Sequence, residues 1–340
     1  MAPPNVDESV VDHYVCSQWM LQTLLFPLVI PRLTEEAVKA KVAEDKPGEI
    51  PPSIREHPTV RYSLLDKVKC PVHVLSAKQG GSSADVNIIF FHGGAFISSF
   101  ISQHVEFAVN LMQEVGVQRT TVYLVEYPHA PKVNHETLLD TVEDVYRAIV
   151  ASASVEGKKV VLMGDSSGGG IALLLAQKLS LLKRKFSSHV QRPDCVLLLS
   201  PWLDVGLSAN PVELALLSAK DPLLDVAGLR ACGRMLANIG GPNQVELDDP
   251  RVSPLFGDLE GLPPVSVWIG SHDLLLTDSR RLRDKYRRTN FTSAPSRIRY
   301  REKTGSLHCF FLFPFHGTTD SIKEMADAIV TDCGLSGNNK

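Results

Sequence analysis

The pentapeptide Gly164-Asp165-Ser166-Ser167-Gly168 places a serine between two glycines, where a short apolar run, 160–163, gives way to a helical pattern. This order of strand, sharp turn and helix is typical of the G-x-S-x-G nucleophile elbow, which exposes a serine hydroxyl at the start of a helix. The glycines leave room for a serine held in an unfavourable backbone conformation. Ser166 is therefore the candidate nucleophile, although so short a pattern also occurs in ordinary glycine-rich loops.

A serine hydroxyl is a weak nucleophile near neutral pH, so it requires a histidine base and usually a carboxylate that orients the base. In folds that carry this elbow, the acid and then the histidine follow the serine along the chain. Four histidines follow Ser166, and His308 lies where the base is expected, between the last predicted strand and the last predicted helix. His189, His272 and His316 are the alternatives, and each of them has a surface or packing role as its simpler explanation.

Asp273 is the preferred acid, because it follows the predicted strand 265–269 through a short turn. Catalytic groups gather at the carboxyl ends of parallel strands, which is where this turn lies. Asp278 is the first alternative, but a carboxylate at the expected start of a helix is also explained as a cap or a partner of the helix dipole. Asp204 is the second alternative and would place the acid one strand earlier.

The oxyanion of a tetrahedral intermediate requires backbone N–H donors. The amide of Ser167 is one expected donor, since this residue directly follows the nucleophile. The segment Gly93-Gly94-Ala95 leaves the buried apolar run 88–91 and is a second source, because small residues let the backbone approach a substrate. The sequence thus predicts an oxyanion hole at the four residues Gly93, Gly94, Ala95 and Ser167.

Strand-like and helix-like segments alternate along most of the chain, which predicts a mostly parallel central sheet flanked by helices. Two runs rich in β-branched residues, 59–65 and 71–76, are expected to open the sheet as antiparallel strands. The later strands are predicted at 88–91, 121–125, 160–163, 195–199, 265–269 and 297–301. The helices are predicted at 104–115, 136–153, 171–182, 211–218, 226–238, 278–289 and 321–331.

Two segments stand apart from this alternation. Val11, Val15 and Trp19 recur at helical spacing, which predicts a helix near the N-terminus, and residues 44–58 read as a linker. Residues 202–263 are a long insertion between strands, and their apolar content favours a folded lid. The expected division is an N-terminal cap segment and linker at 1–58, a core at 59–201 and 264–340, and a cap insertion at 202–263.

The 340 residues are 44% hydrophobic and 21% charged, a composition that suits a chain with a sizeable core. The net charge of -3, with Lys and Arg scattered outside the cluster 280–288, argues against binding to nucleic acid. Six cysteines without paired or zinc-ligand spacing predict reduced thiols and no metal site. We therefore expect a protein without metal or cofactor.

The N-terminus is acidic and carries prolines, so it lacks the positive region of a secretory signal peptide. The apolar stretch 19–30 is interrupted by Pro27 and is too short to span a membrane. Attachment of this stretch to a membrane surface is the less favoured alternative. The expectation is a cytoplasmic protein that acts on a small-molecule ester, with a homodimer left open.

Taken in order, these motifs resemble the hormone-sensitive-lipase-like branch of the α/β-hydrolases, which includes many microbial and fungal carboxylesterases and arylacetamide deacetylase. The resemblance spans most of the chain from about Asn87 onward. The family motif H-G-G-G reads His92-Gly93-Gly94-Ala95 here, and G-D-S-A-G-G reads Gly164-Asp165-Ser166-Ser167-Gly168-Gly169. Further matches follow the family order at 127–131, 253–255, 261–264, 270–273 and 305–308.

The resemblance implies an α/β-hydrolase fold with a helical cap, and a serine esterase or deacetylase whose catalytic residues are Ser166 as nucleophile, His308 as general base and Asp273 as orienting acid. It also implies that the amides of Gly94, Ala95 and Ser167 bind the oxyanion, while Gly93 shapes the loop. An acyltransferase or lactone-forming enzyme with the same triad is one alternative. A non-catalytic ligand-binding protein on the same scaffold is the other.

Two departures from the family pattern lie inside the predicted site. Ala95 replaces the last glycine of H-G-G-G, which keeps an amide but narrows the space around it. Ser167 replaces the usual alanine and adds a hydroxyl beside the nucleophile. Both departures leave the expected mechanism intact and put the acyl-group preference in doubt.

Overall fold

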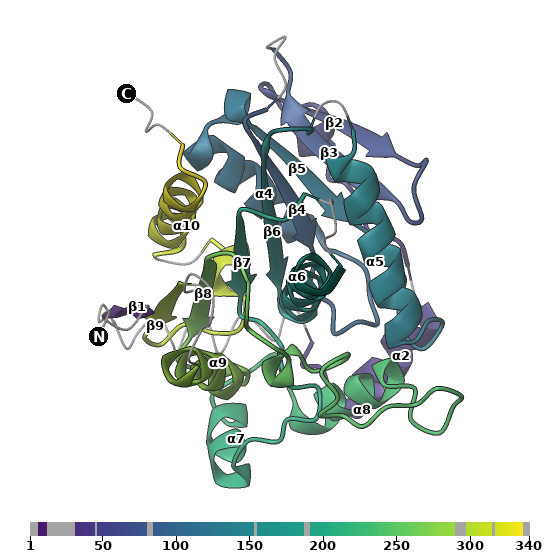
Figure 1. The fold of residues 1–340 in the computed structure, drawn as a ribbon. Helices are drawn as coiled ribbons and strands as arrows, with labels where there is room; N and C mark the ends of the chain where they lie inside the picture. Colours follow the sequence, from purple (N-terminus) through teal and green to yellow (C-terminus); the bar gives the residue numbers. More distant parts are fainter. Residues whose placement is uncertain are drawn as a thin grey trace.

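The computed structural model of the protein describes residues 6–11, 31–44, 46–79, 84–152, 155–186, 191–289, 297–314 and 317–335. A nine-stranded sheet lies at its centre, in the order β1-β9-β8-β7-β6-β4-β5-β3-β2 (Figure 1). The strands are β1 (Val6–Val11), β2 (Val60–Leu65), β3 (Val72–Ala77), β4 (Val86–Phe91), β5 (Thr120–Val125), β6 (Lys159–Asp165), β7 (Cys195–Leu199), β8 (Val265–Gly270) and β9 (Ile298–Lys303).

The sheet is mostly parallel, as predicted. Only β2 and β3 break the pattern: β2 pairs with β3, and β3 pairs with β5, in antiparallel register. All other neighbours run parallel. Every residue of the central strands β4, β7 and β8 is buried, which explains their continuous apolar runs, because helices cover both faces of a parallel sheet.

Helices cover both faces of the sheet. Helix α4 packs against α10 on one face, and α5 lies beside α6 on the other (Figure 1). The helices are α2 (Glu35–Glu44), α3 (Pro52–Arg55), α4 (Ser102–Val115), α5 (His135–Val150), α6 (Ser167–Phe186), α7 (Pro211–Ser218), α8 (Val226–Leu236), α9 (Leu276–Arg288) and α10 (Thr318–Asp332), with short 3-10 turns η1 (Val117–Arg119), η2 (Pro254–Phe256) and η3 (Phe310–Leu312). Helix α6 begins four residues before the predicted start. The prediction missed the first turn because the three glycines in it are poor helix formers and give no helical sequence pattern.

The N-terminal prediction was wrong at Val11. This residue ends strand β1, which pairs in parallel with β9 at the edge of the sheet. The carboxylate of Asp7 accepts hydrogen bonds from the guanidinium of Arg301 on β9. Such a contact between distant parts of the chain cannot be predicted from the spacing of apolar residues. The other residues that defined the predicted helix, Val15 and Trp19, and the apolar stretch 19–30 lie outside the described residues.

A second N-terminal element, α2, was not predicted. Its sequence is dominated by charged residues and alanine, and only Val38 is buried, so it lacks an apolar stripe. The helix packs against α8 from the insertion 202–263. Just before it, the backbone N–H of Leu33 donates a 2.7 Å hydrogen bond to the carbonyl of Leu223. The predicted linker 44–58 contains the short helix α3.

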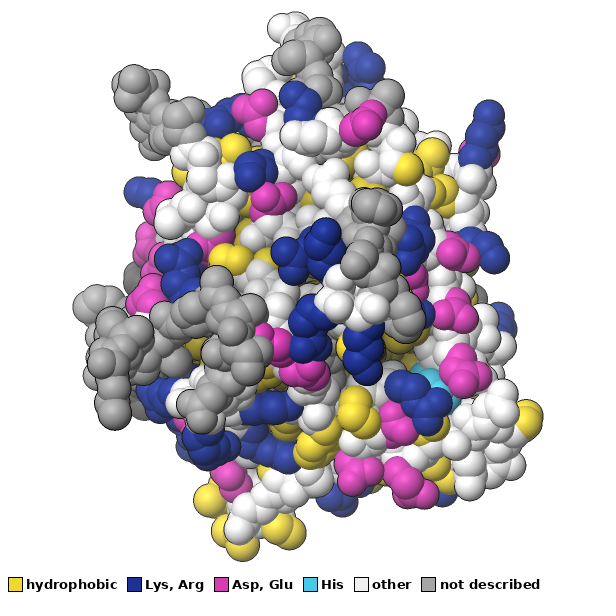
Figure 2. Space-filling view, viewed as in Figure 1, with side chains coloured by type: hydrophobic (Ala, Val, Ile, Leu, Met, Phe, Trp, Pro, Cys, Tyr) yellow, Lys and Arg dark blue, Asp and Glu magenta, His cyan; other side chains and the backbone are white. Residues whose placement is uncertain are grey.

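The surface carries both signs of charge. Lys and Arg side chains are interspersed with Asp and Glu over the visible face rather than gathered in one patch (Figure 2). Exposed hydrophobic side chains are present on α7, where Val212 is 69% and Leu216 is 62% exposed. Within the described ranges, no helix has the length and apolar content that crossing a membrane requires.

Candidate active site

Ser166 lies in a sharp turn between β6 and α6. Its φ angle is +51°, a left-handed conformation that is strained for a residue with a side chain. The flanking glycines are required by close backbone contacts. A Cβ at Gly164 would lie 2.1 Å from the carbonyl oxygen of Gly168, and a Cβ at Gly168 would lie 1.9 Å from that of Phe91. The strand-turn-helix geometry expected from the sequence is therefore present.

The side chains of Ser166, His308 and Asp273 form one hydrogen-bonded chain. The Nε2 atom of His308 is 3.1 Å from Ser166 Oγ, and its Nδ1 atom is 3.0 Å from Asp273 Oδ2. Because an ionised carboxylate only accepts, Nδ1 carries the proton and Nε2 is left to accept from the serine hydroxyl. Burial alone would lower the pKa of His308, but the charge of Asp273 and its hydrogen bond outweigh burial and raise that pKa above its usual value.

The loops that carry the acid and the histidine are packed tightly together. Asp273 follows β8, and its Oδ1 accepts the backbone N–H of Leu275 at 2.8 Å, which fixes the carboxylate. A Cβ at Gly270, the last residue of β8, would lie 2.2 Å from the carbonyl oxygen of Ser306. Only glycine permits this close approach, which brings His308 within reach of Asp273.

The alternative acids and bases lie elsewhere or outside the described residues. Asp278 is in the first turn of α9, and its Oδ2 accepts the backbone N–H groups of Leu203 and Asp204. Asp204 forms an ion pair with Arg281 at 2.7 Å. The carboxylate that contacts His308 is that of Asp273. Among the candidate bases, His308 is the histidine that contacts Ser166 Oγ. The backbone N–H of His272 donates to the carbonyl of Ser306, and His189 and His316 fall in undescribed segments.

Three of the four predicted oxyanion-hole residues border the same space as the serine, and the fourth, Ser167, directly follows the serine and is buried. Gly93, Gly94 and Ala95 line a cavity together with Ser166 and His308. Gly94 has a φ of +130° and Ala95 a φ of +54°, so the loop turns sharply after β4. In the described part of the chain, the backbone amides of Gly94 and Ala95 donate no hydrogen bond, which leaves them available to an oxyanion.

A buried carboxylate that no sequence motif assigned to the site, Asp165, holds this loop. Asp165 Oδ1 accepts the backbone N–H of Gly93 at 2.9 Å, while Oδ2 is 3.3 Å from His104 Nε2 and 3.6 Å from Cys309 Sγ. Burial alone would raise the pKa of Asp165, but the nearby histidines and the Gly93 N–H lower it, so the carboxylate is ionised. The position of Asp165 inside the elbow motif was a signal for it, whereas no motif pointed to His104.

The hydroxyl of Ser167 contacts Tyr127, in the segment 127–131 that follows the family order. It lies 3.3 Å from the hydroxyl of Tyr127, which in turn donates to the carbonyl of His92 at 2.8 Å. Ser167 thereby links the start of α6 to the beginning of the oxyanion loop.

A second missed carboxylate, Asp221, lies next to the triad acid. It comes from the insertion 202–263, and its two oxygens accept the backbone N–H groups of Leu223, Leu224 and Leu274. Leu274 directly follows Asp273, so Asp221 connects the insertion to the loop that carries the triad acid. Burial, followed by the charge of Asp273, raises the pKa of Asp221 to about 6.

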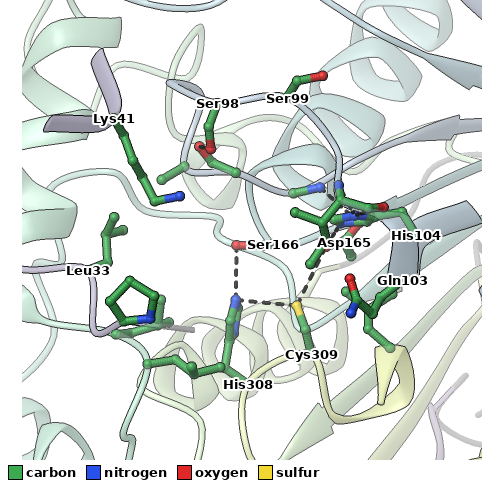
Figure 3. A pocket seen from close by; sticks show the side chains of 18 of the residues that line it. Leu33, Lys41, Ser98, Ser99, Gln103, His104, Asp165, Ser166, His308 and Cys309 are labelled. Carbon is green, nitrogen blue, oxygen red and sulfur yellow. Dashed lines mark hydrogen bonds and ion pairs between the residues drawn. The ribbon is translucent and has the colours of Figure 1, made fainter. Parts of the chain in front are cut away.

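The cavity in front of Ser166 has a volume of about 360 Å³. Ser166 and His308 face it, with Lys41 and Leu33 on one side and Gln103, His104 and Cys309 on the other (Figure 3). Its walls are mainly apolar and include the side chains of Leu33, Leu223, Leu224, Leu229, Leu312 and Phe313. In the part of the chain that the structure describes, no cluster of three or more His, Cys, Asp or Glu residues is suited to hold a metal ion.

The chain matches known proteins over this fold and site. Residues 88–312 match a family described as alpha/beta hydrolase fold. An "Esterase" of Acinetobacter venetianus is 32% identical over 232 residues, which cover 68% of this chain and 70% of that protein. An "Acetyl-hydrolase" of Streptomyces hygroscopicus is 27% identical, over 62% of this chain and 63% of the relative.

Solved structures agree on the fold. A hormone-sensitive lipase from a metagenome library superposes with a TM-score of 0.72 at 22% identity, covering 93% of this chain and 98% of that one. A homologue of hormone-sensitive lipase, EstE7, also from a metagenome library, gives a TM-score of 0.71 at 22% identity. With the family match and the Acinetobacter relative, they confirm the resemblance drawn from the motifs. The chain thus belongs to the alpha/beta hydrolase fold family.

Proposed function

We propose that this serine ester hydrolase cleaves carboxylic esters through an acyl-enzyme on Ser166. The observation that carries the proposal is the hydrogen-bonded chain from Ser166 Oγ through the His308 ring to Asp273. The names of the relatives, an esterase and an acetyl-hydrolase, support the same reaction class. The alternatives, acyl transfer, lactone formation and non-catalytic binding, are not favoured by any of these relatives.

The geometry supports a definite role for each residue. Ser166 Oγ attacks the ester carbonyl while His308 Nε2 accepts its proton, and Asp273 stabilises the imidazolium that forms. The amides of Gly94, Ala95 and Ser167 bind the oxyanion of the tetrahedral intermediate. His308 then returns the proton to the departing alcohol, and water attacks the acyl-enzyme in a second round of the same steps.

We propose that residues 31–58 and 202–263 form a cap over the core residues 59–201 and 264–340, while strand β1 (Val6–Val11) of the predicted N-terminal cap segment 1–58 belongs to the core sheet instead. Leu33 from the first segment and Leu223 from the second are joined by a backbone hydrogen bond, and both line the cavity. The cap thus supplies apolar wall opposite the catalytic loops. A cavity of about 360 Å³ with such walls suits an ester of small or medium size.

The test is hydrolysis of p-nitrophenyl acetate and p-nitrophenyl butyrate by the wild type, Ser166→Ala and the neighbouring Ser167→Ala. Ser166→Ala should lower kcat by at least ~10³-fold, because removal of a triad member leaves only residual catalysis. Ser167→Ala keeps the backbone amide and should stay within about threefold of the wild type. Full activity in Ser166→Ala would overturn the proposal, and a fluorophosphonate that labels the wild type but not this variant would support it.

We also propose a cytoplasmic location and a small-molecule ester as the partner. The five cysteines in the described residues, Cys70, Cys195, Cys232, Cys309 and Cys333, are free thiols, which supports a reducing compartment. Fractionation of cells that express the tagged chain tests the location. Light scattering on the purified protein decides between a monomer and the homodimer that the sequence left open.

A further inference from the structure

The cavity in front of Ser166 contains one lysine and no arginine among the described residues that line it. This lysine, Lys41, lies on α2 and belongs to the wall that faces the catalytic loops. Figure 3 shows its side chain extending from the helix into the cavity, on the side of Ser166 opposite Gln103 and Cys309. The long Lys41 stem covers apolar surface while its ammonium reaches the space where substrate must bind.

The ammonium of Lys41 is not used by the fold. It makes no hydrogen bond or ion pair with any described residue, whereas two arginines of this region, Arg32 and Arg230, are engaged. Arg32 donates to the carbonyls of Ser218 and Leu224, and Arg230 donates to backbone carbonyls after β7. The carboxylate of Glu44, one turn along the same helix, is exposed and pairs with Lys46. Lys46 makes the largest contribution to the lowered pKa of Glu44, and the charge of Lys41 makes a smaller one.

Among the described lining residues, the one carboxylate is also satisfied without Lys41. Asp165 is bonded to the backbone N–H of Gly93, to His104 and to Cys309. Ser98 also lines the cavity, and its hydroxyl donates to the carbonyl of Gly94. The side chains of Leu33, Leu223, Leu224 and Leu229 form an apolar part of the lining and offer no acceptor. A bound substrate would exclude water from this apolar wall, so a charge pair formed there would be stronger than one on the open surface.

From this arrangement we infer that Lys41 binds a carboxylate of the substrate, so that the preferred ester carries a second, negatively charged group. The inference rests on the proposed function of Ser166 and adds a substrate class to it. The carboxylate can belong to the acyl part, as in a half-ester of a dicarboxylic acid, or to the alcohol part, as in an acylated hydroxy acid. In both cases the reaction is ordinary hydrolysis, in which water and the ester give an acid and an alcohol.

Matched ester pairs, in which a carboxylate replaces a terminal methyl group, test the inference. Monoethyl adipate against ethyl hexanoate probes the acyl part, and 4-acetoxybutyrate against butyl acetate probes the alcohol part. The readout is the ratio of kcat/KM for the charged ester to kcat/KM for its neutral partner. It is measured for the wild type, Lys41→Met, Lys41→Arg and the control Lys39→Met, which removes an exposed lysine from the same helix.

We expect the ratio to fall about 10-fold in Lys41→Met for at least one pair, mainly through KM, and to be retained in Lys41→Arg and Lys39→Met. High salt should lower the wild-type ratio in the same direction. An unchanged ratio in Lys41→Met, or a wild type that hydrolyses only the neutral esters, would overturn the inference. Failure of the proposed function looks different, because the wild type would then hydrolyse neither member of either pair.

Discussion

Asp165 and Gly93 are joined by a 2.9 Å hydrogen bond from the glycine amide to the buried carboxylate. The bond links the residue just before the nucleophile to the loop that carries the expected oxyanion donors. A Cβ at Gly93 would lie 2.4 Å from Asp165 Oδ2, so the contact also requires a glycine. The carboxylate thus positions both sides of the site, although it touches no reacting atom itself.

We therefore predict that Asp165→Asn lowers kcat about 10-fold with a smaller change in KM. The amide can still accept from Gly93 through its oxygen, but it turns an NH2 group and no charge toward His104 and Cys309, so the loop loses part of its support. The measurement is steady-state kinetics with p-nitrophenyl butyrate, together with thermal unfolding.

Asp194→Asn is the matched control, because Asp194 accepts the backbone N–H of Val160 at 2.9 Å in a strand end remote from the cavity. It should leave kcat unchanged even if it lowers the melting temperature. A kcat loss of equal size in both variants would show that the effect of Asp165 is one of general stability.

Asp221 provides a second prediction, on pH dependence. Its charge contributes to the raised pKa of His308, after the larger effects of burial and of Asp273. Removing the charge in Asp221→Asn should lower the pKa of the histidine, so that the base is deprotonated at lower pH. The acid limb of the kcat/KM profile, which reports the free enzyme, should then move to lower pH.

The control for this profile is Asp225→Asn. Asp225 also belongs to the insertion and caps α8 by accepting the backbone N–H groups of Ala227 and Gly228, a role that asparagine can fill. Its acid limb should coincide with that of the wild type. If the acid limb of Asp221→Asn also coincides with that of the wild type, the charge of Asp221 does not affect the pKa of His308.

The sheet and the triad could be predicted because their signals are local. Apolar runs mark β4, β7 and β8, and the elbow glycines mark a turn that no larger residue fits. The position of Asp273 just after the predicted strand 265–269 favoured it over Asp278, and the structure brings Asp273 to His308. These features depend on neighbours within a few residues or on a fixed order of motifs.

Other parts of the site could not be predicted, because they depend on contacts between distant segments. Strand β1 pairs with β9 almost 300 positions away, and α2 carries too few apolar residues to show a helical stripe. No sequence motif distinguishes Asp221 from the other residues of the insertion, and only the fold brings it to the loop that carries Asp273. The position of Lys41 at the cavity likewise depends on the packing of α2 against α8, which the sequence did not predict.

Cys309 provides a third prediction, since its thiol lies 3.3 Å from His308 Nε2 and could compete with Ser166 as nucleophile. Burial, followed by the charges of Asp165 and Asp273, raises the pKa of this thiol well above its usual value, so it stays neutral. A neutral thiol is a poor nucleophile. Cys309→Ala should therefore keep kcat/KM within about threefold of the wild type and should still be labelled by a fluorophosphonate. Complete loss of ester turnover in this folded variant would assign the chemistry to the thiol instead.

Asp278 provides the last prediction, which concerns stability. Burial, followed by the charge of Asp204, raises the pKa of Asp278 to about 8 in the folded protein. The unfolded value is about 3.9, so the folded state binds the proton more tightly. The stability contributed by protonated Asp278 is fully present below about pH 4 and is lost as pH rises through about 8.

Asparagine is a neutral replacement that still accepts from the backbone N–H groups of Leu203 and Asp204. The melting temperature of Asp278→Asn relative to the wild type should therefore rise between pH 5 and pH 9, if both are measured at each pH by thermal unfolding. Asp284→Asn, which changes a more exposed acid on the same helix, should follow the wild type over that range. Parallel curves for Asp278→Asn and the wild type would mean that the carboxyl of Asp278 ionises in the fold without the expected penalty from burial and Asp204.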